Sequence, residues 1–368
     1  MTGQKKIQFV DLALKYRPFA EQLHRDLDRV LSSGTYILGA EVERLEEAIK
    51  SFAKVEHAVA VANCTDALML SLKAAGVAAG DEVITTPMSY LATTSSIALC
   101  GANAVFVDVD SCMNLDPDCI EDAITERTRA ISVVHLAGIP AQIERIVDIA
   151  DRHGLSVIED CAQSFGALCG GRFTGTFGRF GAVSFHPLKS LGTLGDGGMI
   201  LTQRIEDSNW MYQARNHGHR GRDECNYWSI NSRLDELHAA FLSSMLQSYP
   251  EELDRRRRLA KIYRTELDGV VSFPFVRETS LPSYNFIMIL VDRRAELIAY
   301  LDNYGIEVKI HYPVLIPDLV AAEQNCRIHG GIANARSMVE RILSVPMAEH
   351  ISEVDARLVC DRIKAFYS

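Results

Sequence analysis

The chain has 368 residues, of which 48% are hydrophobic and 23% are charged, a composition typical of a globular protein. Its net charge of −10 at pH 7 argues against a nucleic-acid partner and against an anionic membrane surface. This length exceeds one ordinary core, so we expect a large domain at residues 1–245 and a smaller one at residues 246–368.

The nine cysteines include no Cys-x-x-Cys pair, which disfavours a zinc site and a disulfide framework. This usage indicates a reducing compartment. The first residues, MTGQKKIQFVDL, have no long apolar stretch, and no later run reaches membrane-spanning length. We therefore expect a cytoplasmic protein with no metal site and no contact with a membrane.

Between residues 57 and 202, short apolar runs alternate with helical patterns. The apolar runs predict strands at 57–62, 81–86, 103–110, 129–136, 155–160, 181–186 and 198–202. The patterns between them predict helices at 65–76, 90–101, 116–124 and 143–154. Strands that are apolar on both faces and alternate with helices belong to a mostly parallel sheet in a three-layer α/β/α fold. In such a fold, ligands bind beyond the carboxyl ends of the strands.

From residue 246 the pattern changes to that of a smaller α+β domain. A long amphipathic helix is predicted at 248–270, and strands at 285–291 and 306–314 flank a helix at 294–305. The long helix contains the arginine run DRRRR (254–258), which we expect on a solvated face.

A helix is predicted to begin directly after the first strand, at the sequence NCTD (63–66). The free N–H groups and the positive dipole end of such a helix can bind an anion. The alternative is that Asn63 or Thr65 only caps the helix.

Two further polar residues follow later strands. Asp160 ends a predicted strand, where alternation points it away from Glu159, and Lys189 lies in the glycine-rich loop HPLKSLGTLGDGG (186–198). Each alone is compatible with an ordinary turn or surface residue. Together with the helix start they match pyridoxal 5′-phosphate, which needs a phosphate cradle, a carboxylate for the pyridine nitrogen and a Schiff-base lysine.

The sequence also resembles the DegT/DnrJ/StrS type of pyridoxal-phosphate sugar aminotransferases, nearly end to end. The resemblance is carried by SGTYILGAEVERLE (33–46), NCTDAL (63–68), GDEVITTPMSYLATT (80–94), IEDCAQSFGA (158–167), SFHPLKSLGTLGDGG (184–198), NSRLDELHAA (231–240) and HYPV (311–314). It implies a fold-type I aminotransferase that works as a homodimer with shared active sites.

Matching positions imply the site residues. Lys189 corresponds to the Schiff-base lysine that also moves the proton, and Asp160 to the partner of the ring nitrogen. Tyr90 corresponds to the aromatic ring stacked on the cofactor, and Asn231 to a phosphate contact from the neighbouring subunit. The implied cofactor contacts are Thr65, Asp66, Tyr90, Asp160, Gln163, Ser184, Lys189 and Asn231.

The resemblance also implies the substrates: L-glutamate as amino donor and a keto- or aldehyde-sugar, nucleotide-linked, as acceptor. The product would be an amino sugar for a polysaccharide, such as lipopolysaccharide, or for a glycoside. Residues 216–228 resemble a loop that lines the partner's site. Candidate sugar contacts, each of which also has a purely structural interpretation, are Tyr36, His186, His217, Lys309 and Tyr312.

Three positions depart from the family pattern. Cys64 replaces a usual glycine, Arg179 replaces a usual aspartate, and Ser232 stands where tyrosine is frequent, a change that we associate with amination at the third sugar carbon. Two alternative functions exist on the same fold. A pyridoxamine-dependent sugar dehydratase would carry histidine in place of Lys189, and a silent regulatory protein would not need the full set of cofactor residues.

Overall fold

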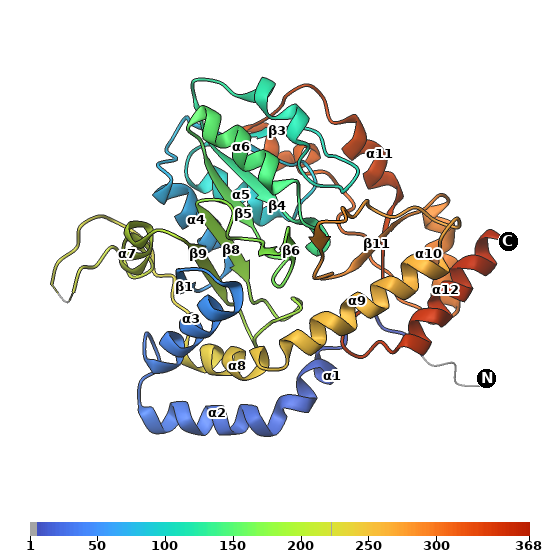
Figure 1. Ribbon diagram of the computed structural model, residues 1–368, viewed down its shortest axis with the longest axis horizontal. Coiled ribbons are helices and arrows are strands. Elements are labelled where there is room, and N and C mark those ends of the chain that lie inside the picture. Colours follow the sequence, from blue (N-terminus) through green and yellow to red (C-terminus); the bar gives the residue numbers. More distant parts are fainter. Residues whose placement is uncertain (1–5, 222) are drawn as a thin grey trace.

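An eight-stranded sheet forms the centre of the computed structural model, which describes residues 6–221 and 223–368 (Figure 1). The strand order is β1 (His57–Val61), β9 (Gly198–Thr202), β8 (Phe180–Ser184), β5 (Ser156–Asp160), β4 (Thr128–Val134), β2 (Glu82–Thr85), β3 (Asn103–Phe106) and β12 (Cys326–Ile328). Only β9 runs against its neighbours in this sheet, so the prediction of a mostly parallel sheet is confirmed.

Helices cover both faces of the sheet, because alternate strand residues point in opposite directions. In β1, Ala58 and Ala60 pack in one buried cluster, whereas Val59 and Val61 pack in another. The first face carries α3 (Ala40–Ala53), α6 (Ile143–His153) and α8 (Glu236–Leu246). The opposite face carries α4 (Cys64–Ala74), α5 (Leu91–Leu99) and α7 (Ile205–Ala214). The predicted three-layer architecture is confirmed.

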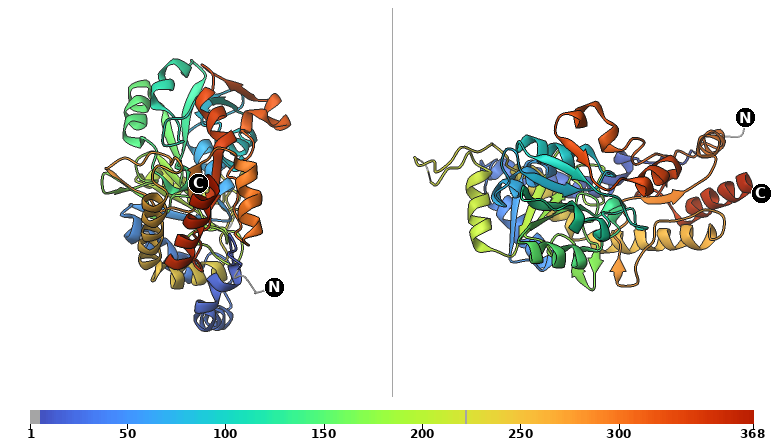
Figure 2. Two further views of the ribbon diagram at one scale, coloured as in Figure 1. Left: turned by 90° about the vertical axis from the view of Figure 1, so that its right-hand side faces the viewer. Right: turned by 90° about the horizontal axis from the view of Figure 1, so that it is seen from above.

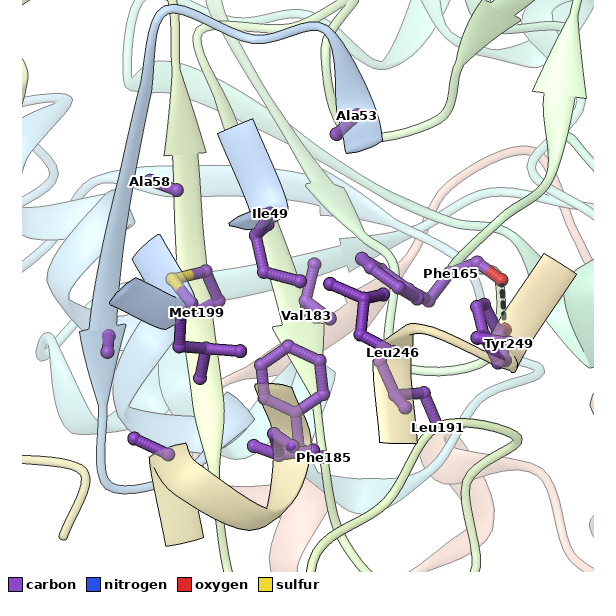
Figure 3. Close-up of a cluster of buried hydrophobic side chains, with 14 of the residues drawn as sticks. Ile49, Ala53, Ala58, Phe165, Val183, Phe185, Leu191, Met199, Leu246 and Tyr249 are labelled. Atoms are coloured by element: carbon purple, nitrogen blue, oxygen red, sulfur yellow. Dashed lines mark hydrogen bonds between the residues drawn. The ribbon is translucent and has the colours of Figure 1, made fainter. Parts of the chain in front are cut away.

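A buried cluster beneath β8 and β9 fixes the strand that leads to Lys189 (Figure 3). Val183 and Phe185 pack there against side chains of α3 and α8, such as Ile49 and Leu246. At one side, the Tyr249 hydroxyl donates a hydrogen bond of 2.7 Å to a main-chain carbonyl in the segment after β5. Close packing of this kind leaves the end of β8 little freedom to move.

The C-terminal part of the chain lies beside the sheet and packs on α9 (Tyr249–Glu266) (Figure 2). Strands β11 (Ile287–Leu290) and β13 (Ile342–Val345) pair antiparallel. They are accompanied by α10 (Arg294–Asn303), α11 (Ala333–Arg341) and α12 (Glu353–Tyr367). Strand β12 comes from the C-terminal part of the chain but pairs with β3 of the main sheet. The two parts therefore contribute to one sheet, and the domain boundary between residues 245 and 246 stays a prediction.

The N-terminal segment adds α1 (Leu12–Tyr16) and α2 (Ala20–Ser33), separated by a 3₁₀ turn at Arg17–Phe19. A small three-stranded sheet joins β6 (Leu168–Cys169), β7 (Arg172–Phe173) and β10 (Ser280–Leu281). Among the described residues, none of the helices combines the length and the apolar composition that crossing a membrane requires.

Three local predictions were wrong. The helix expected at 116–124 is two 3₁₀ turns, Pro117–Cys119 and Glu121–Ala123, because Asp116 and the proline begin a tight turn. The strand expected at 306–314 forms only single bridges, from Ile306 and from Lys309. The arginine run is solvated only in part: Asp254 and Arg258 are exposed as expected, whereas Arg256 is buried and pairs with Glu252 and Glu349 at 2.7 and 2.8 Å.

Candidate active site

A cavity of about 830 Å³ opens beyond the carboxyl ends of the central strands. Its walls combine residues that follow β1, β5 and β8 with residues from the two ends of the chain. The sequence-predicted residues that line it are Thr65, Asp66, Tyr90, Asp160, Gln163, Ser184, His186, Lys189, Lys309 and Tyr312. The cavity therefore lies where parallel α/β sheets bind their ligands.

The start of α4 forms one wall of this cavity. The Asn63 side chain caps the helix by accepting the Asp66 N–H at 2.8 Å. The Asp66 N–H is thus engaged inside the chain, contrary to its expected role towards an anion. The N–H groups of Cys64 and Thr65, in the same first turn, have no acceptor within the helix and can bind an anion.

Ser232 also holds the start of α4 in place. Its buried hydroxyl accepts the Ala62 N–H at 3.1 Å and donates to the Asp66 carboxylate at 2.6 Å. Ser232, one of the three departures from the family pattern, therefore orders the loop that precedes α4.

Asp160 ends β5 and turns its buried carboxylate towards α5. Thr93 donates to one carboxylate oxygen at 2.7 Å, and the Ala162 N–H donates to the other at 3.1 Å. Ser89 in turn lies 2.7 Å from the Thr93 hydroxyl. These contacts fix the orientation of the carboxylate at the cavity wall.

Glu159, the preceding residue, points to the other face of the sheet. Its carboxylate accepts the N–H groups of Gly175, Phe177 and Gly178 at 2.7–2.8 Å and the His135 Nε2 at 3.0 Å. His135 Nδ1 accepts the Ala141 N–H, which assigns the proton to Nε2. Cys161 is close enough to complete a metal-binding trio with these two residues, but the His135 nitrogens and the Glu159 oxygens are already engaged in the hydrogen bonds above.

Lys189 enters the cavity from the glycine-rich loop. Burial lowers the pKa of its ammonium group, and Cys64 and Asp160 offset this only in part. A lowered pKa favours the neutral amine, which is the form that attacks a carbonyl. Burial and Lys189 also lower the pKa of the neighbouring His186, which lines the same cavity.

The outer part of the cavity is aromatic and polar. Gln163 accepts the Ala137 N–H at 2.6 Å and donates to the Tyr312 hydroxyl at 2.9 Å. The rings of Tyr90 and Tyr312 lie 5.8 Å apart, and Tyr90 is exposed. Gln163 is therefore held at the edge of the cavity by residues from two different parts of the chain.

His311 is a cavity residue that the sequence analysis did not select. Its ring stacks on Phe286 at 4.2 Å, and Nδ1 lies 2.9 Å from the Ser344 hydroxyl. Burial, reinforced by Lys189, lowers the pKa of His311 to about 4, so the imidazole is neutral at physiological pH. The only sequence signal was its place in the HYPV motif.

Three predicted residues do not reach this cavity. Tyr36 is half exposed, His217 is exposed, and Asn231 forms a single bridge with Asn216. Asn231 and His217 belong to the segment between α7 and α8, which projects from the body of the molecule (Figure 1). A role for them would need the cavity of a second subunit.

The other two departures have local explanations. Arg179 makes a two-pronged ion pair with Asp207 of α7, at 2.7 and 2.9 Å, and so ties β8 to that helix. Cys64 is buried at the cavity wall, where burial and Asp160 raise the pKa of its thiol well above the usual value. The thiol is therefore neutral.

This donor set fits pyridoxal 5′-phosphate. One cavity brings together an amine with a lowered pKa, an oriented carboxylate and a helix start with free N–H groups. These are the groups that the aldehyde, the ring nitrogen and the phosphate of this cofactor require.

Comparison with known proteins gives a consistent result. The model of the DegT/DnrJ/EryC1/StrS aminotransferase family matches residues 19–364. The chain is 37% identical to the pleiotropic regulatory protein of Geobacillus stearothermophilus, with 98% of each chain covered. It is 35% identical to the dTDP-3-amino-3,4,6-trideoxy-alpha-D-glucose transaminase of Streptomyces venezuelae, with 98% of this chain and 96% of the relative covered.

The fold has a matching solved structure. A DegT DnrJ EryC1 StrS aminotransferase from Brucella abortus superposes with a TM-score of 0.95 at 34% identity. The match covers 98% of this chain and 100% of the other.

Proposed function

Because the chain belongs to the DegT/DnrJ/EryC1/StrS aminotransferase family and is a pyridoxal-phosphate-dependent aminotransferase, we propose that it moves the amino group of L-glutamate onto a nucleotide-linked keto- or aldehyde-sugar. The observation that carries the proposal is the single cavity shared by Lys189, Asp160 and the start of α4. The transaminase from Streptomyces venezuelae, whose name specifies a dTDP-linked amino sugar, supports this class of acceptor.

Each residue of the site has a part in this reaction. When bound, the cofactor supplies an electron sink that stabilises negative charge on the reacting substrate carbon. Asp160 would keep the ring nitrogen protonated, and the free N–H groups of Cys64 and Thr65 in the first turn of α4, with the Ser184 hydroxyl, would hold the phosphate. Gln163 and Tyr90 would position the ring. The Lys189 amine would attach the cofactor and then carry a proton to and from the substrate carbon.

The acceptor would enter above these groups, where Lys309, Tyr312 and His186 line the cavity. Lys309 is exposed there and offers a cation to an acidic sugar or a diphosphate. Ser232, together with the 3-amino sugar in the relative's name, favours the third sugar carbon as the position that receives the amine. The amino sugar would serve polysaccharide or glycoside synthesis in the cytoplasm.

The proposal includes a homodimer with shared sites. Asn231, His217 and Tyr36 lie outside their own cavity, and the segment from 216 to 228 projects from the body. Trp228 on this segment is 94% exposed, which is unusual for so large an apolar side chain. We propose that this segment covers the cavity of the partner, where Asn231 would reach the phosphate.

The first test is the absorption spectrum of the purified protein with pyridoxal phosphate, before and after excess L-glutamate. The yellow band of the lysine-bound cofactor should appear and then give way to that of the pyridoxamine form. A yellow protein whose spectrum does not change on addition of L-glutamate would refute L-glutamate as the amino donor. A protein that binds no chromophore would refute the proposal and favour a regulatory role like the one in the name of the Geobacillus relative.

A further inference from the structure

Lys15, in the last turn of α1, reaches the main chain of the reacting lysine. Its side chain is buried, with 7% of the residue exposed. Its ammonium group lies 3.0 Å from the Pro187 carbonyl and also contacts the carbonyl of Lys189 itself. These two carbonyls face α1, so α1 lies against the loop that carries Lys189.

Tyr16, the next residue of α1, makes a second attachment to the same loop. Its hydroxyl donates to the Thr193 carbonyl at 2.8 Å. Lys15 and Tyr16 thus hold main-chain oxygens at both ends of the segment from 187 to 193. We call this segment, with its two attachments, the lysine loop.

The N–H groups of the lysine loop are held separately. The Lys189 N–H donates to the His186 carbonyl at 2.8 Å, and the Thr193 N–H donates to the Phe185 carbonyl at 2.8 Å. The Ser190 N–H donates to the Asn285 side chain at 3.1 Å. The loop is therefore fixed from two directions, and α1 supplies the contacts to its carbonyls.

The Lys15 ammonium is held in place by an ionic group from the other end of the chain. Glu349 lies 3.6 Å away and pairs with Arg256 of α9 at 2.8 Å. Although burial acts in the opposite direction, Arg256 and Lys15 hold the pKa of Glu349 at about 2, so this carboxylate is ionised at any physiological pH. Burial lowers the pKa of Lys15, and Glu349 opposes that shift.

A buried ionic group of this kind adds little net stability, because desolvation offsets most of the attraction. Its geometric effect is larger, since it joins α1, α9 and the segment after β13 to a loop of only a few residues. Small displacements of a reacting group reduce rates strongly. The position of the Lys189 main chain therefore depends on the N-terminal segment.

We infer that Lys15 is a positioning residue for Lys189: its ammonium group fixes the main chain of the reacting lysine, and Glu349 and Arg256 fix that ammonium group. The inference rests on the proposed role of Lys189. It goes beyond the family assignment because it gives Lys15, which lines the same cavity, a role that acts through the main chain of Lys189.

The experiment compares Lys15→Met with Lys15→Arg, and with Lys50→Met as a control that removes an ion-paired lysine on α3. Hydrogen exchange is followed in peptides that span residues 186–196 of the full-length protein, with and without pyridoxal phosphate. Because the lost hydrogen bonds are charge-assisted, exchange in Lys15→Met should rise about tenfold in this segment. Exchange in Lys15→Arg should stay within about threefold of the wild type, since arginine keeps both charge and donors.

Kinetics provide the second measurement. We expect kcat of Lys15→Met for the glutamate half-reaction to fall about tenfold, with KM for glutamate unchanged within about twofold. If Lys15→Met does not fold, Tyr16→Phe decides instead, because it removes one attachment and leaves every charge in place. It should raise exchange in the same segment by about threefold.

The inference is overturned if Lys15→Met, or Tyr16→Phe in its place, exchanges like Lys50→Met at residues 186–196. It is also overturned if exchange rises evenly across the protein, which would indicate a purely structural role. Reduction of the bound cofactor onto the protein, followed by peptide mass spectrometry, tests Lys189 independently. A label on another lysine would refute the proposed site, whereas the exchange result would still stand.

Discussion

The floor and the rim of the cavity are built in different ways. The floor consists of residues 63–66, Asp160, Ser184 and Lys189, which lie at or beyond the carboxyl ends of strands of the main sheet. The rim consists of residues from the two ends of the chain, namely Lys15, Lys309, His311, Tyr312 and Glu349. One sheet edge positions the floor residues, and Lys15, held by Glu349, additionally fixes the main chain at Lys189 from the rim. The other rim residues, Lys309, His311 and Tyr312, can vary with the substrate with less effect on the reacting groups.

The largest expected effect comes from breaking the floor at Lys189. Lys189→Ala should lower turnover by roughly 10³-fold or more, because it removes both the attachment of the cofactor and the proton carrier. Release of 2-oxoglutarate from L-glutamate measures the loss. Lys309→Ala, which removes a cation from the rim, should leave this half-reaction near the wild-type rate, and equal losses in both variants would contradict the division into floor and rim.

Asp160→Asn should have the second-largest effect on turnover. The variant keeps the shape of the side chain and its contact with Thr93 but removes the charge, so kcat should fall by roughly 10²- to 10³-fold in both half-reactions. Rapid-mixing absorbance for each half-reaction provides the measurement. A loss smaller than tenfold in either would show that another group protonates the ring.

A change in the rim should affect the reaction with the sugar acceptor more than the reaction with L-glutamate. Tyr312→Phe removes a hydroxyl from the wall that the acceptor would meet, whereas Gln163 keeps the hydrogen bond that it accepts from the Ala137 N–H, so kcat/KM for the sugar acceptor should fall about tenfold. The rate with L-glutamate should change by less than about threefold. Steady-state kinetics with each substrate varied in turn test this, and an equal loss for both substrates would place Tyr312 in the floor.

The smallest effect on turnover should come from an ion-pair cluster that belongs to neither the floor nor the rim. Glu82 of the main sheet pairs with Arg127 at 2.7 Å and with Arg327 of β12 at 2.9 Å. Burial acts in the opposite direction, yet hydrogen bonds from both arginines and from Thr125 lower the pKa of Glu82 from 4.5 to about 2.

A lowered pKa in the folded state contributes stability that is complete above pH 4.5 and is lost as the pH falls towards 2. Glu82→Gln should therefore reduce the free energy of unfolding by about 2 kcal/mol at pH 7 and by less at pH 3. Urea unfolding at the two pH values provides the measurement. If Glu82→Gln lowers the free energy of unfolding equally at the two pH values, the ionised carboxylate is not the source of the stability.

The sequence predicted the floor well because its signals are local. The apolar run before Asp160 and the glycine-rich loop around Lys189 each indicate the end of a strand. The carboxyl ends of parallel strands lie at the same edge of a sheet, so these residues were expected to lie together. The rim lacked such signals. Lys15, Arg256 and Glu349 meet only after α9 and both chain ends have packed, so a helical pattern alone placed Arg256 on the solvated side. Similarly, residues 306–314 are apolar enough for a strand, but only single bridges were available to them.

The two neighbouring acids of β5 carry a lesson for engineering. Glu159 is fully engaged in fastening the chain on one face, whereas Asp160 faces the cavity on the other. Because side chains alternate along a strand, inserting or deleting a single residue here would exchange the two. Residues 156–160 therefore have to keep their register when the protein is altered for new substrates.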